Sequence, residues 1–389
     1  MTVEAENKRL IPPFTDEHEA LRASLRSFVQ KEIHPHVHDW EAAQEFPREL
    51  FTRMGELGFL GLKYPEEYGG QGGDYVHDAV FTEEMARCGS GGVAAGIGGH
   101  VGIATPPIFK FGTEQQKQRW LVPAIKGERI AALAITEPGA GSDVAGIKTY
   151  ARRDGDEYVV NGSKTFITNG VRGDIFVTAV KTTEAGGHHG VSFLVLEREM
   201  EGFEVSRKLE KLGWHASDTG ELAFSDVRVP AENLLGEENK GFYLIMANFQ
   251  WERILMALGA VGGMQATFDR TLAYAKEREA FGRPIGSFQA IRHKLAWMAT
   301  QIEAGRDLTY HALRLFVSGQ DALKEVSYAK LFCCDAAVEV ADEAVQIHGG
   351  YGYMREYDVE RALRDSRLGP IGGGTSEIMK EIIGKQLGL

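Results

Sequence analysis

Glu252 is the residue whose neighbours first suggest chemistry. In the segment NFQWERILMALG, a helix would place Ile245, Phe249 and Met256 on the same stripe as this carboxylate. No Lys or Arg stands three or four residues away, so no cation of the same helix faces it. A carboxylate among apolar neighbours is either neutral or functional, because burial raises its pKa toward that of a general base. The local sequence alone leaves both possibilities open.

A glycine-rich turn is the second feature that could serve chemistry. The segment ALAITEPGAGSDVAG (132–146) joins a β-like run to a turn that carries the hydroxyls of Thr136 and Ser142. Glycines let the backbone approach a planar or anionic ligand closely because they have no Cβ. An ordinary turn at the corner of a sheet would contain the same residue types. The segment KTFITNG (164–170) follows shortly after, and the two together are more specific than either alone.

Several familiar catalytic motifs are absent from the sequence. There is no G-x-G-x-x-G, and the looser form ending in Ala, GSGGVA (89–94), follows a helical pattern rather than a strand, so no Rossmann site is predicted. P-loop, H-E-x-x-H and G-x-S-x-G motifs are also missing. The three histidines of HPHVH (34–38) do not share one helical face, and no metal site is predicted.

The elements that must position these residues follow a helical, β, helical order. Residues 1–128 carry helical stripes punctuated by Gly and Pro and predict an N-terminal helical domain. Residues 129–239 contain short β-branched and aromatic runs separated by Asp-Gly and Asn-Gly turns, which predict a central antiparallel β domain, a barrel or a sandwich. Residues 240–389 predict a C-terminal four-helix-bundle domain from helical patterns over 242–261, 264–279, 288–317 and 326–350. The predicted fold class is α+β.

Composition excludes several classes of protein. The 389 residues are 43% hydrophobic and 25% charged, which excludes a disordered, collagen-like or coiled-coil chain. With 43 basic and 55 acidic residues the net charge is −12, which disfavours wholesale binding to nucleic acid or anionic membranes. No apolar run approaches the roughly 20 residues of an uninterrupted membrane span. Three cysteines cannot build a disulfide framework and the polar N-terminus is unlike a leader, so we expect a reducing cytoplasm.

Two long motifs, one in each half of the chain, make the sequence resemble the acyl-CoA dehydrogenase family of flavoproteins. The first is AITEPGAGSD (134–143), with Gly146 in register. The second, QIHGGYGYMREYDVERALRD (346–365), meets the family pattern at Gln346, Gly349, Gly350, Gly352, Tyr353, Glu356, Arg361 and Asp365. The resemblance covers essentially the whole chain and agrees with the predicted order of elements.

The resemblance implies FAD, bound where the β domain meets the C-terminal helices. Thr168 would hydrogen-bond the flavin ring, and Arg278 would meet the pyrophosphate, a contact that suits a guanidinium. Many relatives carry Trp at the position of Phe166, which retains an aromatic face. The segment 346–350 would reach over from a neighbouring subunit, which implies a homo-oligomer, commonly a tetramer built as a dimer of dimers. The implied FAD contacts are Leu133, Ile135, Thr136, Gly141, Ser142, Phe166, Ile167, Thr168, Arg278, Phe281, Gln289, Gln346, Gly349, Gly350, Thr375 and Glu377.

The resemblance also implies a reaction and a base. The family removes the α-hydrogen of an acyl-CoA as a proton and the β-hydrogen as a hydride to flavin, so a carboxylate must stand beside the α-carbon. In much of the family that Glu lies in I-Y-E-G-T, and the matching IGGGT (371–375) puts Gly373 at its position. The long-chain and isovaleryl branches carry the base on the helix that here contains Glu252, which is therefore the expected base. Gly373 would still offer its backbone N–H to the thioester carbonyl, and Glu377 is the rival carboxylate.

Substrate contacts and partners complete the expectation. Residues along the path of the CoA thioester would be Ser142, Gln250, Arg253 and Gly374, and segments 90–105 and 240–260 would wall the acyl pocket. The expected product is a trans-2-enoyl-CoA, with electrons passed to an electron-transferring flavoprotein. Chain length, branching and a carrier-protein thioester in place of CoA remain open. Two alternatives are a flavin oxidase or monooxygenase that uses O₂ and a catalytically silent FAD-binding protein, the latter suggested by Gly373.

Overall fold

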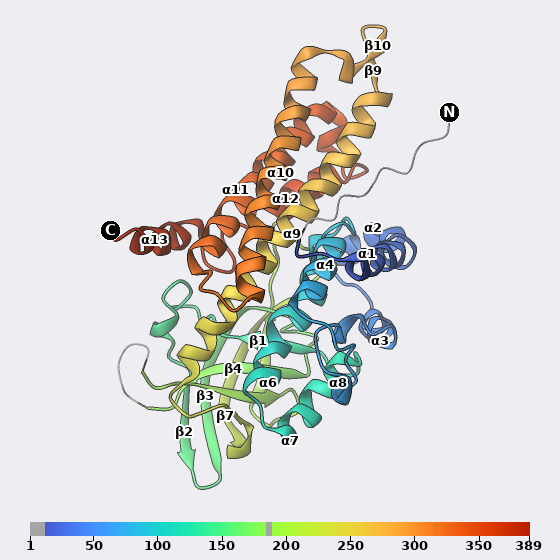
Figure 1. Cartoon of the computed structure of the whole chain (residues 1–389). Helices are drawn as coiled ribbons and strands as arrows, with labels where there is room; N and C mark the ends of the chain where they lie inside the picture. Colours follow the sequence, from blue (N-terminus) through green and yellow to red (C-terminus); the bar gives the residue numbers. More distant parts are fainter. Residues whose placement is uncertain (1–11, 184–188) are drawn as a thin grey trace.

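Helices, a central sheet and a second group of helices succeed one another along the chain (Figure 1). The computed structural model describes residues 12–183 and 189–389. Of the N-terminal stretch considered for a leader, residues 1–11 lie outside this range. The α+β class is confirmed, with a helical N-terminal part, a β middle and a helical C-terminal part.

The N-terminal helices begin at residues that can cap them. Thr15 and Asp74 precede the first turns of α1 and α4, where side-chain oxygens satisfy backbone N–H groups that have no helical partner. Leu25 and Phe28 of the predicted stripe are buried against the core. The helices are α1 (Asp16–Phe28), α2 (Val37–Ala43), α3 (Glu49–Glu56), α4 (Tyr75–Ala86), α5 (Gly91–Gly98), α6 (Thr105–Phe111), α7 (Glu114–Gln116) and α8 (Val122–Ile125).

The middle of the chain forms one sheet that does not close on itself. Its hydrogen-bonded path runs β6-β7-β3-β2-β4-β5-β8, and β1 pairs in parallel with β4. The path ends at β6 and β8, so of the two predicted alternatives the sheet is sandwich-like rather than a barrel. Side chains from both halves, such as Val160 of β3 and Leu194 of β5, share one buried cluster. The strands are β1 (Ala131–Ala134), β2 (Tyr150–Asp154), β3 (Glu157–Thr168), β4 (Ile175–Lys181), β5 (Val191–Glu197), β6 (Phe203–Lys208), β7 (Thr219–Pro230) and β8 (Leu234–Leu235).

Three long helices dominate the C-terminal part. The two helical patterns predicted over 242–261 and 264–279 belong to one helix, α9 (Gly241–Glu277). Gly262 lets α4 approach this helix closely, because a Cβ there would lie 2.5 Å from the Glu83 carbonyl oxygen of α4. Two shorter helices pack against α11, so the bundle has three long members and two short ones. The remaining elements are β9 (Glu279–Ala280), β10 (Arg283–Pro284), α10 (Gln289–Val317), α11 (Leu323–His348), α12 (Val359–Ser366) and α13 (Ser376–Gln386).

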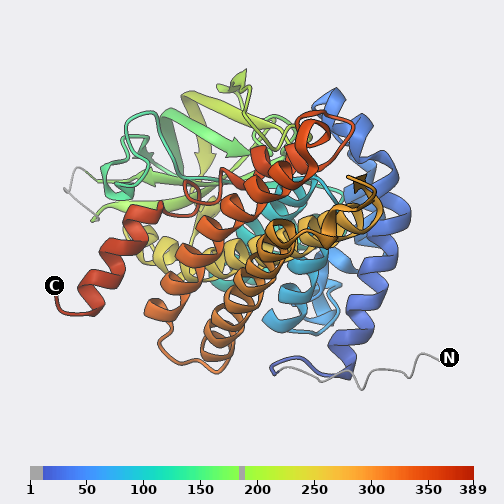
Figure 2. The same cartoon turned by 90° about the horizontal axis from the view of Figure 1, so that it is seen from above.

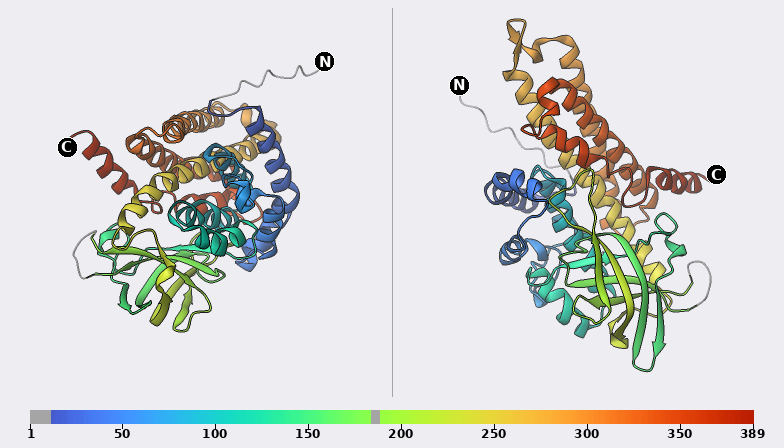
Figure 3. Two further views of the ribbon diagram at one scale, coloured as in Figure 1. Left: turned by 60° about the horizontal axis from the view of Figure 1, so that its bottom comes forward. Right: turned by 180° about the vertical axis from the view of Figure 1, so that it is seen from behind.

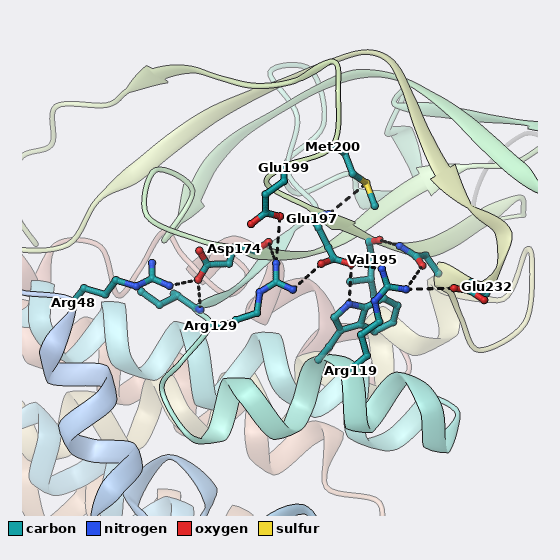
Figure 4. A network of polar contacts seen from close by, with 12 residues as sticks. Arg48, Arg119, Arg129, Asp174, Val195, Glu197, Glu199, Met200 and Glu232 are labelled. Carbon is teal, nitrogen blue, oxygen red and sulfur yellow. Dashed lines mark hydrogen bonds and ion pairs between the residues drawn. The ribbon is translucent and has the colours of Figure 1, made fainter.

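A partly buried carboxylate joins the N-terminal helices to the sheet (Figure 4). Glu197, at the end of β5, accepts hydrogen bonds of 2.6 Å from both Arg119 and Arg129, and Trp120 Nε1 donates to it at 3.3 Å. Nearby, Arg48 pairs with Asp174. Two guanidinium groups on one carboxylate leave little freedom for the helices to slide over the sheet.

The helix α9 connects the sheet to the far end of the molecule. Its first turns lie beside the sheet, and its last turn carries the β9–β10 hairpin at the opposite end, a separation visible from the front and from behind (Figures 1 and 3). The helix α13 projects from the bundle at the C-terminus (Figure 2). Among the described residues, no helix combines the length and apolar character that crossing a membrane requires.

Candidate active site

Glu252 is buried on the fourth turn of α9, with only 9% of its surface exposed. Asn248, one turn earlier, donates its side-chain N–H to Glu252 Oε1 at 2.6 Å and also reaches the Ile103 carbonyl at 3.2 Å. Burial raises the pKa of Glu252 to about 7, although the Asn248 hydrogen bond and the charge of Arg253 act in the opposite direction. A carboxylate with a pKa near 7 is suited to take a proton at neutral pH.

Arg253 is a buried cation beside that carboxylate. It is 6% exposed, and its Nε has no hydrogen-bond partner among the residues that the structure describes. Its guanidinium lies 5.8 Å from the centre of the Phe249 ring. Burial lowers its pKa below the ordinary value, and the carboxylate of Glu252 acts against this. A buried donor without a partner is costly, which is typical of a group that awaits a ligand.

A glycine loop covers the same part of α9. Gly373 has φ +62°, and a Cβ there would lie 3.3 Å from Met256 Cγ, while Gly374 has φ +94° and lies against Arg253. Lys330 of α11 holds the loop, because its buried ammonium donates to the carbonyls of Gly369 at 2.8 Å and Gly374 at 2.5 Å. Since Arg253 and Met256 flank Glu252 on the helix, the structure brings the predicted base and the Gly373–Gly374 backbone to one place.

The residues after the loop form the start of α13 instead of facing α9. Thr375 caps the helix by accepting the Ile378 N–H at 3.2 Å. Glu377 is exposed, and its own backbone N–H and the Thr375 hydroxyl lower its pKa below the ordinary value. Exposure and a lowered pKa are the opposite of what a general base needs, so the geometry favours Glu252 over this rival.

The two motif segments of the β region lie side by side. Lys164 of β3 donates to Glu137 at 2.8 Å and to the Ile135 carbonyl at 2.9 Å, and all three residues are buried. Glu137 also accepts the backbone N–H groups of Lys148 and Thr149, which closes the glycine-rich turn. Several predicted FAD contacts surround the Glu137–Lys164 ion pair. Leu133 and Thr136 are partly exposed, Ile135 and Ile167 are buried, and Gly141, Ser142 and Phe166 are exposed.

Thr168 ends β3 next to the helical segment Gly99–Ala104. A Cβ at Gly99 would lie 3.2 Å from Thr168 Cγ2. The same segment meets α9, because a Cβ at Gly102 would lie 2.6 Å from Leu255 Cδ1. Residues 99–104 therefore bridge the end of β3 and the part of α9 that carries Glu252. Gln250 is partly exposed on this part of α9.

A second group of predicted FAD contacts lies at the other end of α9. Arg278 follows the helix and lies over the Tyr351 ring at 5.2 Å, while Tyr274 stacks on His348 at 4.1 Å, which joins this end of α9 to the end of α11. At about 1.5 Å per residue, Glu252 and Arg278 are separated by about 39 Å along the helix. A single chain does not bring the two groups together. The second group comprises Arg278, Phe281, Gln289, Gln346, Gly349 and Gly350, all of them exposed.

The character of both groups fits a flavin dinucleotide. A Cβ on Gly139, Gly141, Gly349 or Gly350 would meet no atom within 4 Å, so these backbones are open. Phe166 is 68% exposed and Phe281 94%, an unusual state for aromatic side chains unless something covers them. No ion pair of the described residues occupies the Arg278 guanidinium. Open backbone, exposed aromatic faces and an available guanidinium match a planar ring and a pyrophosphate.

Three features of the site were not predicted as such. Asn248 stands four residues before Glu252, but its hydrogen bond to the carboxylate depends on side-chain rotamers, which the sequence does not show. Glu137 lies in the segment 132–146 and Lys164 in the segment 164–170. The opposite charges of these two residues were the available sequence signal that they form an ion pair. Lys330 gave no local signal, because its partners are carbonyl groups of a loop far along the chain.

The chain combines a helical–β–helical architecture with a buried carboxylate on α9, that of Glu252, and comparison with known proteins gives the family. The family models for the acyl-CoA dehydrogenase N-terminal, middle and C-terminal domains match residues 15–128, 132–227 and 239–388. The chain is 44% identical to the probable acyl-CoA dehydrogenase YngJ of Bacillus subtilis, over 96% of this chain and 98% of that protein. It is 43% identical to the mitochondrial long-chain specific acyl-CoA dehydrogenase of Mus musculus, over 96% and 87%.

Solved structures agree with these relatives. A probable acyl-CoA dehydrogenase from Mycobacterium abscessus matches with a TM-score of 0.93 and 48% identity, over 96% of this chain and 99% of that one. An acyl-CoA dehydrogenase from Bacillus anthracis complexed with FAD matches with a TM-score of 0.91 and 36% identity, over 97% and 68%. The chain belongs to the acyl-CoA dehydrogenase family. Membership confirms the expected enzyme class, an oxidoreductase, and the expected cofactor, FAD.

Proposed function

We propose that the protein dehydrogenates an acyl-CoA thioester to the trans-2-enoyl-CoA and that Glu252 is the base that takes the α-proton. The observation that carries this proposal is the burial of Glu252, with a pKa of about 7, beneath the Gly373–Gly374 loop and beside Arg253. The FAD that residues such as Thr168 and Arg278 would hold would supply the acceptor for the β-hydrogen, which leaves as a hydride. The other steps are performed by side chains and backbone of the chain itself.

Proton removal depends on the surroundings of Glu252. Its ionised form must be available near neutral pH, and the Asn248 hydrogen bond stabilises that form against the effect of burial. The same contact fixes the direction of the carboxylate, because Asn248 is tied to the Ile103 carbonyl as well. A substrate α-carbon above Oε2 would therefore meet an oriented base.

The thioester carbonyl needs a donor as the α-proton leaves, because negative charge develops on its oxygen. We assign this role to the backbone N–H of Gly373, whose left-handed φ suits glycine. Such a donor is commonly worth about 3 kcal/mol in the transition state. Lys330 supports the loop from behind, and Arg253 and Ser142 would line the approach of the thioester. Gly374 and Gln250 complete the proposed substrate contacts.

A second copy of the chain would complete the cofactor site. The first group of FAD contacts, near β1 and β3, and the second group, at the end of α9 and α11, lie too far apart to meet one FAD within one chain. A partner subunit arranged by twofold symmetry would place its Arg278 and Phe281 beside the β region of this chain, and reciprocally. We propose such a dimer, paired further into a tetramer, as the active form.

The proposal also names an electron acceptor and a cellular compartment. We propose an electron-transferring flavoprotein as the acceptor. A chain in the solved structure of the electron transferring flavoprotein of Acidaminococcus fermentans is similar to this one, with a TM-score of 0.94, 39% identity and coverage of 97% and 99%. We propose a reducing cytoplasm as the setting, supported by Cys88, Cys333 and Cys334, which are all buried and unpaired.

The experiment that tests the proposal is anaerobic reduction of the bound flavin by a panel of acyl-CoA thioesters of different length and branching. Wild type should lose its oxidised flavin absorbance, and Glu252→Gln should keep FAD but react about 10²–10⁴-fold more slowly. The matched control is Glu237→Gln, the same change at an exposed carboxylate just before α9, which should react as wild type. The thioester that reacts fastest identifies the substrate class.

Other outcomes would redirect the assignment. Equal reduction of wild type and Glu252→Gln would remove Glu252 as the base and turn attention to Glu377. Rapid formation of peroxide in air would favour the oxidase or monooxygenase alternative. Failure of every thioester to reduce the flavin would favour a silent FAD-binding protein, and acyl carrier-protein thioesters should be included in the panel before that conclusion.

A further inference from the structure

A cluster of two histidines and one aspartate joins the beginnings of α1 and α4, far from the catalytic groups. His18, Asp74 and His77 place one potential metal-ligating atom each within 4.8 Å of the others. The His18 and His77 rings face each other with centroids 4.3 Å apart. His77 Nδ1 lies 2.8 Å from Asp74 Oδ1, and Glu17 Oε1 lies 3.7 Å from His77 Nε2.

The free nitrogen of His18 has no partner in this arrangement. Its Nδ1 accepts the Thr15 N–H at 3.1 Å and contacts the Thr15 hydroxyl at 2.8 Å, as part of the cap of α1. Its Nε2, on the other side of the ring, is buried and has no hydrogen-bond partner among the described residues. That atom lies 4.0 Å from Asp74 Oδ1, and the residue is only 6% exposed. A buried ring nitrogen without a partner, directed at a carboxylate, needs an explanation.

We propose that His18, Asp74 and His77 bind one divalent transition-metal ion, with Zn²⁺ as the best-suited ion. Two imidazole nitrogens favour zinc over magnesium or calcium, which prefer oxygen ligands. In a tetrahedral zinc site, ligand atoms lie about 3.3 Å apart. The 4.0 Å between His18 Nε2 and Asp74 Oδ1 thus requires a movement of less than about 1 Å.

Acidic residues offset the positive potential of two helix N-termini at this point. The helices α1 and α4 run in the same direction, since His18 faces His77 while Arg22, one turn on, pairs with Glu83 at 2.7 Å. Two helix N-termini therefore meet, and their partial positive charges would repel a metal ion. Asp74 and the acidic residues of the first turn of α1, Asp16, Glu17 and Glu19, offset that charge.

The position of the cluster lets an ion enter from solvent and lets a bound ion join two helices. The Asp74 side chain is 60% exposed and that of Glu17 is 79% exposed, so an ion can enter from solvent. A bound ion would clamp the start of α1 to the start of α4, at the opposite end of the contact from the ion pairs that Arg22 and Arg26 make with Glu84. The proposal is independent of the catalytic assignment, and its failure would leave that assignment untouched.

The test is calorimetric titration of the FAD-bound enzyme, freed of any histidine tag and treated with a chelator, with Zn²⁺ alone. We expect one Zn²⁺ per chain, a rise in melting temperature on binding, and no displacement by a large excess of Mg²⁺. Asp74→Asn is the sharpest variant, because Asn caps a helix as well as Asp does but removes the anionic ligand. It should weaken Zn²⁺ binding at least about tenfold, as should His77→Gln. His38→Gln, a change at an exposed histidine outside the cluster, should bind as wild type.

Two results would overturn the site. One is absence of stoichiometric binding by wild type. The other is equal affinity in wild type, Asp74→Asn and His77→Gln, which would mean adventitious binding elsewhere. Because neither variant residue lies in the hydrophobic core, loss of binding can be separated from misfolding by the retained FAD absorbance and an unchanged melting temperature without zinc. Bound Co²⁺ gives a second readout, since tetrahedral coordination intensifies its visible absorption at wavelengths beyond the flavin band.

Discussion

The two ends of α9 differ in almost every physical respect. Near its start, Glu252 and Arg253 are buried, and a single chain supplies every neighbour described around them: Asn248, the glycine loop and the segment Gly99–Ala104. At its end, Arg278 and Phe281 are exposed, and their nearest neighbours in the chain belong to other exposed segments. One end has the low dielectric that shifts a pKa, and the other has the open surface that a large charged cofactor requires.

This difference indicates that proton transfer and cofactor binding depend on different parts of the molecule. Proton transfer needs a dry, preorganised pocket, which one chain can build within its own core. Holding a dinucleotide needs a long surface, and the chain offers its two parts at opposite ends of one helix. We infer that catalysis is a property of the subunit, whereas tight retention of FAD is a property of the assembly.

The largest expected effect comes from mixing two inactive variants. Hybrids that contain one Glu252→Gln chain and one Arg278→Gln chain would hold one doubly damaged site and one intact site if Arg278 acts across the interface. Purified hybrids carrying two different tags should then show about half of wild-type flavin reduction at limiting FAD. If both residues serve the same chain's site, no intact site exists and the hybrids should stay as inactive as the parents.

Arg278→Gln alone should weaken FAD retention. Loss of charge-assisted hydrogen bonds to a pyrophosphate should raise the dissociation constant of FAD by about 10–100-fold. Flavin fluorescence on dilution measures this constant. Arg283→Gln, in the same hairpin and also exposed, is the matched control and should retain FAD normally. Equal retention in both variants would contradict the role of Arg278.

Lys330→Met should slow the reaction at the Glu252 end of α9 without weakening FAD binding at the Arg278 end. The change removes the donors that hold the Gly369 and Gly374 carbonyls, so the Gly373 N–H should lose its fixed position. We expect kcat/KM to fall about tenfold with FAD content unchanged. Steady-state kinetics with the best thioester give the value, and Lys380→Met, at an exposed lysine of α13, is the control. A normal rate in Lys330→Met would show that the loop needs no such support.

The smallest effect concerns pH. Because Glu252 must be ionised to accept a proton, flavin reduction by wild type should rise as the pH passes through about 7. The Asn248 hydrogen bond lowers the pKa of this carboxyl, so Asn248→Leu should raise it and move the midpoint upward by about one pH unit. The variant should be about fivefold slower at pH 7 and equal to wild type near pH 9. An unchanged midpoint would mean that Asn248 does not tune the base.

Much of the fold followed from local patterns. The strands β2 to β7 all lie within residues 129–239, where β-branched and aromatic runs between turn residues predict strands. The single long α9 was predicted as two patterns, since Gly262 and Gly263 look like a break when the neighbouring α4 is not in view. The sequence left the choice between barrel and sandwich open, because closure depends on strand pairing across the whole sheet.

The residues of the candidate site likewise divide into those that a local sequence pattern indicates and those that it does not. Glu252 stood out because an isolated charge on an apolar stripe is a local pattern. Lys330 and the cluster of His18 with His77 did not, because their partners are distant in sequence and meet only through packing. The three histidines of 34–38, by contrast, are neighbours along the chain, and all three side chains are exposed.

The length of α9 has a consequence for how this chain can vary. A residue inserted in this helix would turn everything beyond it by about 100° and advance it by about 1.5 Å. Glu252 and Arg278 would then no longer keep their relative angle, so one insertion would misdirect the hairpin that reaches the other subunit in the proposed dimer. In the proposed assembly, the length of α9 therefore sets the spacing between active sites. Point substitutions along its exposed side should be tolerated far better than any change in its number of residues.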